Sequence, residues 1–169
     1  MRPDWTLEIQ GLSGVRRFLP TRVPAGWSVA EIRLGVASVL DTPIDFSGSS
    51  RVVDALEVVL TDRVATTRGM VRSRNGSNVG GLRVAAFSTD RSRWYDRSRF
   101  VTSTVTTNDG AFSFTSLPTD TYYVAIVPSS LDDPNAWRDP SALDELAWRA
   151  STVSVQEGTT VTIELESRP

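Results

Sequence analysis

Short stretches in which apolar and polar residues alternate, each closed by a turn signal, run through most of this chain and favour a β-rich fold. The segment Thr106–Pro128 has the sequence TTNDGAFSFTSLPTDTYYVAIVP. In it, an Asn-Asp-Gly turn precedes an alternating strand, and a proline-led corner precedes a strand that is apolar on both faces. We therefore expect a hairpin with its turn at Asn108-Asp109-Gly110, then a corner and a central strand that ends at Pro128.

Two further segments extend the β pattern. Asn75-Gly76 separates TRGMVRS from LRVAAF, and this dipeptide predicts a β-hairpin because both residues tolerate positive φ. Near the C-terminus, TVTIEL places Val161, Ile163 and Leu165 on one face. The sequence therefore predicts an all-β protein.

One segment, RDPSALDELAWRA, has a helical pattern instead. Asp139 can cap a helix N-terminus, and Pro140 suits the first helical position. The apolar residues at helical spacing are Leu143, Leu146, Ala147 and Ala150. We expect one short helix near the C-terminus, from about Pro140 to Arg149.

The composition excludes several classes of function. The 169 residues include no Cys and no His, so disulfides, zinc-thiolate sites and Ser-His-Asp or Cys-His catalysts are impossible within this chain. The net charge is −2, with all 18 basic residues arginine, which gives no general attraction to nucleic acid. We expect no catalytic residue, no metal site, no cofactor and no nucleic-acid partner.

The N-terminus, MRPDWTLEIQGLSG, lacks the basic and apolar regions of a signal peptide, and no apolar stretch is long enough to span a membrane. The sequence leaves two alternatives open: a cytoplasmic protein, or a fragment or mature form of an exported one.

Three segments recur in the same order in the two halves of the chain. WTLEIQGL resembles GAFSFTSL, VPAGWSVAEI resembles LPTDTYYVAI, and ALEVVL resembles VTIEL. We therefore expect two related modules: an incomplete or shortened one in residues 1–63 and a complete one in residues 64–169.

From Val64 to Leu165 the chain resembles the carboxypeptidase regulatory-like domain, a transthyretin-like (prealbumin-like) β-sandwich. The residues that carry the likeness are Gly69, Val71, Gly76, Gly81, Val84, Gly110, Phe112, Phe114, Leu117, Pro118 and Tyr122. Two positions depart from the pattern: Asn78 replaces a usual proline, and Asp120 replaces a usual glycine.

The resemblance implies tandem Greek-key β-sandwich modules without catalytic activity. Such domains follow peptidase domains, precede outer-membrane receptors or occur in tandem on bacterial surface proteins. It thus implies a structural or interaction module of an exported or cell-envelope protein, in the periplasm or at the cell surface. Its partner would be another domain of the same polypeptide or a second protein.

The candidate binding site is the loop DRSRWYDRSRF at positions 90–100. Its candidate residues are Arg91, Arg93, Trp94, Tyr95, Arg97 and Arg99. Arginines interleaved with aromatic rings can hold anionic groups or stack on sugars, which supports an alternative function as a carbohydrate- or peptide-binding module. The structural interpretation is a long loop whose aromatic rings fold back on the sandwich.

Two other groups of residues have structural interpretations that we favour. The carboxylates Asp132, Asp133, Asp139, Asp144 and Glu145 lack the spacing of a calcium loop, and helix capping and solvation account for them. The tryptophans Trp5, Trp27, Trp137 and Trp148 are expected in core or corner positions or beneath the helix rather than on a sugar-binding platform.

Overall fold

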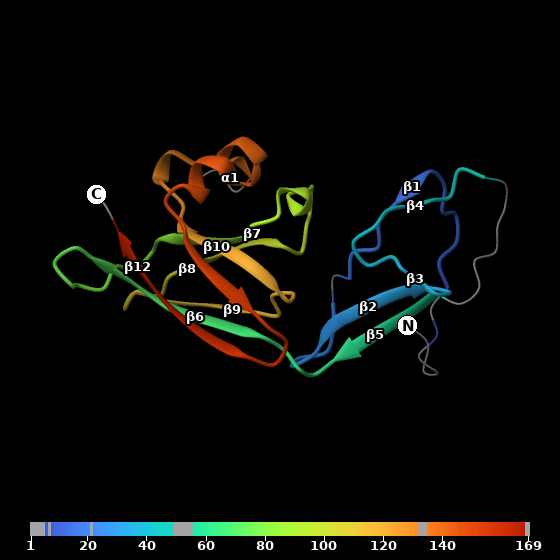
Figure 1. The fold of residues 1–169 in the computed structure, drawn as a ribbon, viewed down its shortest axis with the longest axis horizontal. Coiled ribbons are helices and arrows are strands. Elements are labelled where there is room, and N and C mark those ends of the chain that lie inside the picture. The colour runs from blue at the N-terminus through green and yellow to red at the C-terminus, as the bar shows by residue number, and fades with distance from the viewer. Residues whose placement is uncertain (1–5, 7, 21, 49–55, 132–134, 168–169) are drawn as a thin grey trace. The chain divides into compact units, whose positions relative to one another are not determined.

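The computed structural model describes residues 6, 8–20, 22–48, 56–131 and 135–167. The chain divides into two compact units, Met1–Asp62 and Arg63–Pro169. Most of the regular structure is β-strand, with one short α-helix, as Figure 1 shows. The all-β prediction is confirmed at this level.

The C-terminal unit is a β-sandwich. Its described strands are β6 (Thr66–Ser73), β7 (Arg83–Ser88), β8 (Val101–Val105), β9 (Ala111–Thr115), β10 (Asp120–Ile126), β11 (Ser151–Val155) and β12 (Thr160–Ser167). One sheet has the order β11-β10-β7-β8 and the other has the order β12-β6-β9. All neighbours are antiparallel except β12, which pairs with β6 in parallel.

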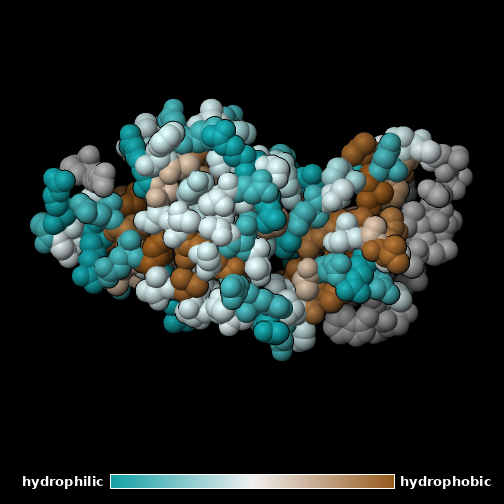
Figure 2. Space-filling model, viewed as in Figure 1, coloured by the Kyte–Doolittle hydropathy of each residue, from teal (hydrophilic) through white to brown (hydrophobic). Residues whose placement is uncertain are grey.

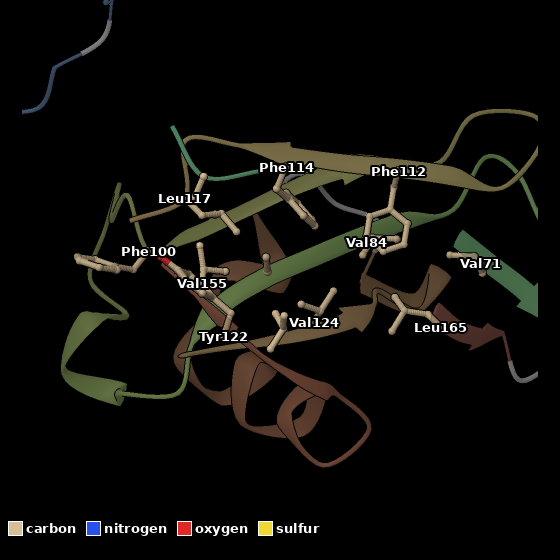
Figure 3. Packing of buried hydrophobic residues seen from close by; sticks show 13 residues of the cluster. Val71, Val84, Phe100, Phe112, Phe114, Leu117, Tyr122, Val124, Val155 and Leu165 are labelled. Carbon is tan, nitrogen blue, oxygen red and sulfur yellow. The ribbon is translucent and has the colours of Figure 1, made fainter. Parts of the chain in front are cut away.

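The main core lies between these two sheets. Figure 3 shows Phe112 and Phe114 of β9 pointing at the side chains of the opposite sheet. Tyr122 of β10 is fully buried there, and its hydroxyl donates a hydrogen bond to the Pro118 carbonyl at 2.9 Å. That bond fixes the corner before β10 while the ring fills the core, so one side chain serves both purposes.

A second hydrophobic layer covers the other face of the four-stranded sheet. The helix α1 (Pro140–Ala147) and the 3-10 helix η3 (Ala136–Arg138) lie over β7 and β10, away from the second sheet (Figure 1). Because both faces of the sheet are covered, β10 is apolar on both sides, which confirms the central strand expected from the sequence.

The predicted helix is confirmed, two residues shorter than expected at its C-terminus. The Asp139 side chain accepts a hydrogen bond from the Ser141 backbone N–H at 2.9 Å, and Leu143 and Leu146 are buried. Among the residues that the structure describes, no helix is long and apolar enough to span a membrane.

The prediction of a hairpin at Asn75-Gly76 is wrong, because the strands on either side of the turn do not pair with each other. The turn itself forms, with Gly76 at φ +83°, but β6 and β7 on either side of it belong to different sheets. The same holds for the turn between β8 and β9 at Gly110. A turn signal specifies local backbone angles, whereas the sheet that each strand joins depends on distant strands.

Gly110 has a further constraint beyond its φ of +80°. A Cβ built there would lie 2.7 Å from the Val71 carbonyl oxygen, and the Gly110 carbonyl accepts the Val71 N–H at 2.8 Å. The turn therefore packs directly against β6, and a side chain at this position would separate the two.

The N-terminal unit is smaller in its described part. It contains β1 (Val15–Arg16), β2 (Ser28–Leu34), β3 (Ala37–Ser38), β4 (Ile44–Asp45) and β5 (Leu56–Thr61). These strands form one sheet of order β3-β2-β5 and a separate β1-β4 pair. The buried hydrophobic residues described in this unit are Ile32, Val39 and Leu40.

The sequence repeat is not reproduced in the pairing of these strands. β2 and β5 pair with each other, whereas their counterparts in the repeat, β10 and β12, lie in opposite sheets. The first repeat segment begins at Trp5 and includes Leu7, both outside the described residues, and positions 8–12 form no strand. The tandem-module interpretation and the boundary at residue 63 stay predictions.

Candidate ligand-binding cleft

The C-terminal unit contains a cleft of about 1080 Å³ beside β8. Three segments line it: the loop residues Trp94–Arg99, the strand residues Val101–Ser103, and Asn135–Pro140 from the η3 region. Arg83, on the neighbouring strand β7, completes the lining. The cleft thus lies between η3 and the edge strand β8.

Arginine dominates the charge of the cleft. The arginines in its lining are Arg83, Arg97, Arg99 and Arg138, and the carboxylates are Asp96 and Asp139. Asp139 is engaged as the helix cap. The positive charge is therefore in excess, and guanidinium groups bind carboxylate and phosphate through paired N–H donors.

Two of these arginines have weak or no contacts with described carboxylates. The Arg97 side chain is 78% exposed, and its contact with Asp96 is a long one, at 3.9 Å. Arg138 stacks on the Trp137 ring at 4.8 Å and has no carboxylate partner among the described residues. An exposed pair at such a distance contributes little, so Arg97 can exchange water for a ligand.

Trp94 is part of the core, in agreement with the structural interpretation of the loop. Only 8% of it is exposed, and its indole N–H donates to the Ser88 carbonyl at 2.7 Å. Its ring packs edge-on against Phe87 with the centroids 5.6 Å apart. Trp94 therefore contributes a wall of the cleft and no open face on which a sugar could stack.

Arg91 and Arg93 do not line the cleft. Arg91 forms an ion pair with Asp144 of α1. Arg93 pairs with Asp120 at 2.8 Å and with Asp90 at 3.5 Å. These contacts tie the loop to the helix and to the start of β10, so both arginines have structural roles.

The unusual Asp120 explains part of this arrangement. Its carboxylate accepts the Ser88 hydroxyl at 2.6 Å in addition to its pair with Arg93. A glycine at this position would offer no such acceptor. Asp120 therefore helps to anchor the candidate loop.

Of the predicted residues, the structure brings Trp94, Tyr95, Arg97 and Arg99 to the cleft. Arg99 also lies over the Phe100 ring at 4.7 Å. Sequence reasoning missed Arg83 and Arg138. Nothing local marks them, because they reach the cleft only through the pairing of β7 with β8 and the placement of η3.

Two of the candidate carboxylates, Asp139 and Asp144, have structural partners. Hydrogen bonds from Ser141 hold the pKa of Asp139 below its usual value, and bonds from Ser92 do the same for Asp90. Asp144 pairs with Arg91. Asp132 and Asp133 lie outside the described residues, and the described part of the chain contains no cluster of acidic side chains that could hold a metal ion.

The tryptophans divide between core and surface. Trp137 is 1% exposed beneath the helix layer, as expected, but Trp148 at the end of α1 is 91% exposed. Trp27 is 41% exposed and follows a turn at Pro24, so it lies at a corner, one of the two positions expected for it, and not in the core. Trp5 lies outside the described residues.

No family model and no curated protein matches this chain. Solved structures with some similarity include a streptococcal ancillary pilin, at 13% identity and a TM-score of 0.42, covering 77% of this chain and 39% of the pilin. The Bacillus anthracis TIE protein has 14% identity and a TM-score of 0.40, covering 66% of this chain and 19% of that protein.

A third similar structure is the dioxygenase domain of a dioxygenase carbohydrate-binding protein fusion from Streptomyces sp. SirexAA-E. It has 17% identity and a TM-score of 0.38, covering 62% of this chain and 79% of that domain. The chain spans less than half the length of the pilin and of the TIE protein. These weak likenesses, which include both an enzyme domain and a pilin, carry no argument about function.

Proposed function

We propose that this chain is a non-catalytic interaction module of an exported or cell-envelope bacterial protein, and that its cleft binds a carboxylate-bearing protein partner. The observation that supports the proposal is the excess of arginine in the cleft, with Arg97 and Arg138 at its surface. The motifs from Gly69 to Tyr122 support assignment of the C-terminal unit to the carboxypeptidase regulatory-like class. The sequence repeat supports a shortened module of the same class in residues 1–63.

A protein partner is favoured over a neutral glycan by the aromatic residues. Sugar-binding sites commonly use an open aromatic face, whereas Trp94 and Trp137 are both buried. What the cleft offers is guanidinium charge together with Ser103 of β8 and the half-buried Tyr95. This chemistry suits side-chain carboxylates.

The test is titration of the full chain at low salt with poly-L-glutamate and, separately, with polygalacturonate. We expect poly-L-glutamate to bind, and added salt to weaken the binding because exposed charges are screened. The double variant Arg97→Ala, Arg138→Ala should lose this binding. The matched control, Arg74→Ala with Arg149→Ala, removes the same charge from exposed arginines outside the cleft and should bind as wild type does.

Equal loss of binding in both double variants would mean that net charge alone attracts the polymer, and the cleft would have no part in it. Binding of polygalacturonate alone through Arg97 and Arg138 would overturn the protein partner in favour of the acidic-glycan alternative.

A further inference from the structure

The strand β8 is an edge of its sheet, and its outer edge faces the cleft. Val101, Thr102 and Ser103 line the cleft in succession. Since neighbouring side chains of a strand point to opposite faces, a cavity over one face would touch only every second residue. Contact with all three indicates that the cleft reaches the backbone of β8, which is an edge strand of its sheet.

The hydrogen bonds to β7 show which backbone groups of β8 point outward. Ser88 N–H donates to the Phe100 carbonyl at 3.0 Å, and Thr106 N–H donates to the Leu82 carbonyl at 2.8 Å. In an antiparallel pair, every second residue is bonded to the neighbour. Residues 102 and 104 therefore bond to β7, whereas residues 101, 103 and 105 direct their backbone groups away from it.

The N–H groups of Ser103 and Val105 have no hydrogen-bond partner within the described part of the chain. A fixed row of donors and acceptors at the edge of a sheet is a template for a further strand. Proteins usually cover or charge such edges. Here the positive charge is on the arginines that line the cleft with β8.

The position of Arg83 indicates which face of an added strand would carry acidic side chains. Ala85 pairs with Ser103 and Arg83 pairs with Val105, so Arg83 is on the same face of the sheet as Ser103, which its guanidinium contacts at 3.5 Å. The Trp137 and Phe87 side of the sheet is this same face. A strand added to β8 would direct every second side chain toward this face, on which Arg83 lies.

We propose that the cleft takes up an extended peptide segment that pairs with the outer edge of β8 and carries acidic side chains at alternate positions. This proposal rests on the proposed function and adds to it the binding mode and the sequence pattern of the partner. The backbone bonds to Ser103 and Val105 supply register, and the arginines select glutamate or aspartate on one face.

The test uses the full chain and a synthetic peptide of alternating glutamate and valine, about seven residues long, near the length of an average strand. A second peptide has the same sequence with methylated nitrogens at the positions that pair with β8. We expect the first to bind and the second to bind at least about tenfold more weakly, since it loses several backbone hydrogen bonds.

Amide hydrogen exchange supplies a measurement that needs no substitution. Bound peptide should slow exchange at Ser103 and Val105 severalfold, while Thr102 and Thr104, which bond to β7, should change little. Ser103→Pro, which removes one outward N–H, should weaken binding about three- to tenfold, the effect of one hydrogen bond. Ser103→Ala removes the hydroxyl but keeps that N–H, so it should weaken binding less than Ser103→Pro does.

Equal binding of the methylated and unmethylated peptides, with Ser103 and Val105 unprotected, would overturn strand addition. If the Arg97→Ala, Arg138→Ala double variant still failed to bind the peptides in that case, the proposed function with an acidic partner would stand, but without strand addition. Binding of neither peptide nor poly-L-glutamate would overturn both proposals.

Discussion

Both compact units of this chain have alternating apolar and polar residues in their strands, but they bury very different numbers of hydrophobic side chains. Among the described residues, 23 hydrophobic side chains are buried in the C-terminal unit and three in the N-terminal unit. The exposed large hydrophobic residues of the N-terminal unit are Ile9, Val15, Leu19, Val23, Trp27, Val36 and Val58. Figure 2 shows hydrophobic patches on the visible face of this unit.

The difference shows that alternation alone does not make a core. The four-stranded sheet of the C-terminal unit has a second sheet on one face and α1 with η3 on the other. In the described N-terminal residues, β2 has only the short β3 and β5 beside it. The described core of this unit has only three buried residues, with five partly buried ones packed against them, and so small a core contributes little stability. We therefore expect the C-terminal unit to account for most of the cooperative stability.

The largest effect is expected from truncation of the inter-sheet core. Phe112→Ala should lower the free energy of unfolding by about 3–5 kcal/mol, because it removes a buried ring and leaves a cavity. Ile32→Ala in the N-terminal unit should leave the main thermal transition nearly unchanged. Calorimetry checks both predictions. An equal shift in melting temperature for the two variants would contradict the claim that the two units differ in their contribution to stability.

A smaller effect is expected at the turn before β9. Gly110→Val should destabilise by roughly 1–3 kcal/mol from its positive φ, and further from its contact with Val71. Gly81→Val is the matched control, since Gly81 has a φ of +75° with nothing within 4 Å of a built Cβ. Denaturant unfolding should rank Gly110→Val as clearly the more damaging, and equal losses would mean that the packing of the turn on β6 contributes nothing.

These positions also show how far sequence reasoning reaches. Asp139 and Pro140 begin the helix where capping rules place it, and the glycine at the Asn-Asp-Gly turn has the expected positive φ. Both outcomes depend on neighbours within a few residues. Which of the two sheets each strand joins, and the burial of Trp94, depend on segments far apart in the chain. For the same reason, the cleft that joins Arg83 to Arg138 could not be predicted.

The helix cap gives a pH-dependent effect of modest size. Because hydrogen bonds from Ser141 hold the pKa of Asp139 below its usual 3.8, ionised Asp139 stabilises the fold above that pH. This stabilisation is lost as the pH falls through the lowered pKa. The melting temperature of Asp139→Asn, which keeps a capping acceptor that does not titrate, should therefore fall less on acidification than that of the wild type. Parallel curves would show that the cap is not linked to stability.

The smallest effect is expected at the exposed end of α1. Trp148→Ser should change the stability of the C-terminal unit by less than about 0.5 kcal/mol, since the side chain is 91% exposed. Trp137→Ser, beneath the same helix layer, should be strongly destabilising. Thermal melts of the two variants separate surface from core, and a large loss for Trp148→Ser would indicate that a partner surface covers it.

The central claim is that the C-terminal unit provides both the stable fold and the binding site. The most direct measurement is the change in backbone amide NMR shifts when the alternating Glu-Val peptide is added to the full chain. We predict shifts at Arg97, Ser103 and Arg138, and none in β2 or β5 of the N-terminal unit. Shifts confined to β2 and β5, or none at any residue lining the cleft, would contradict the claim.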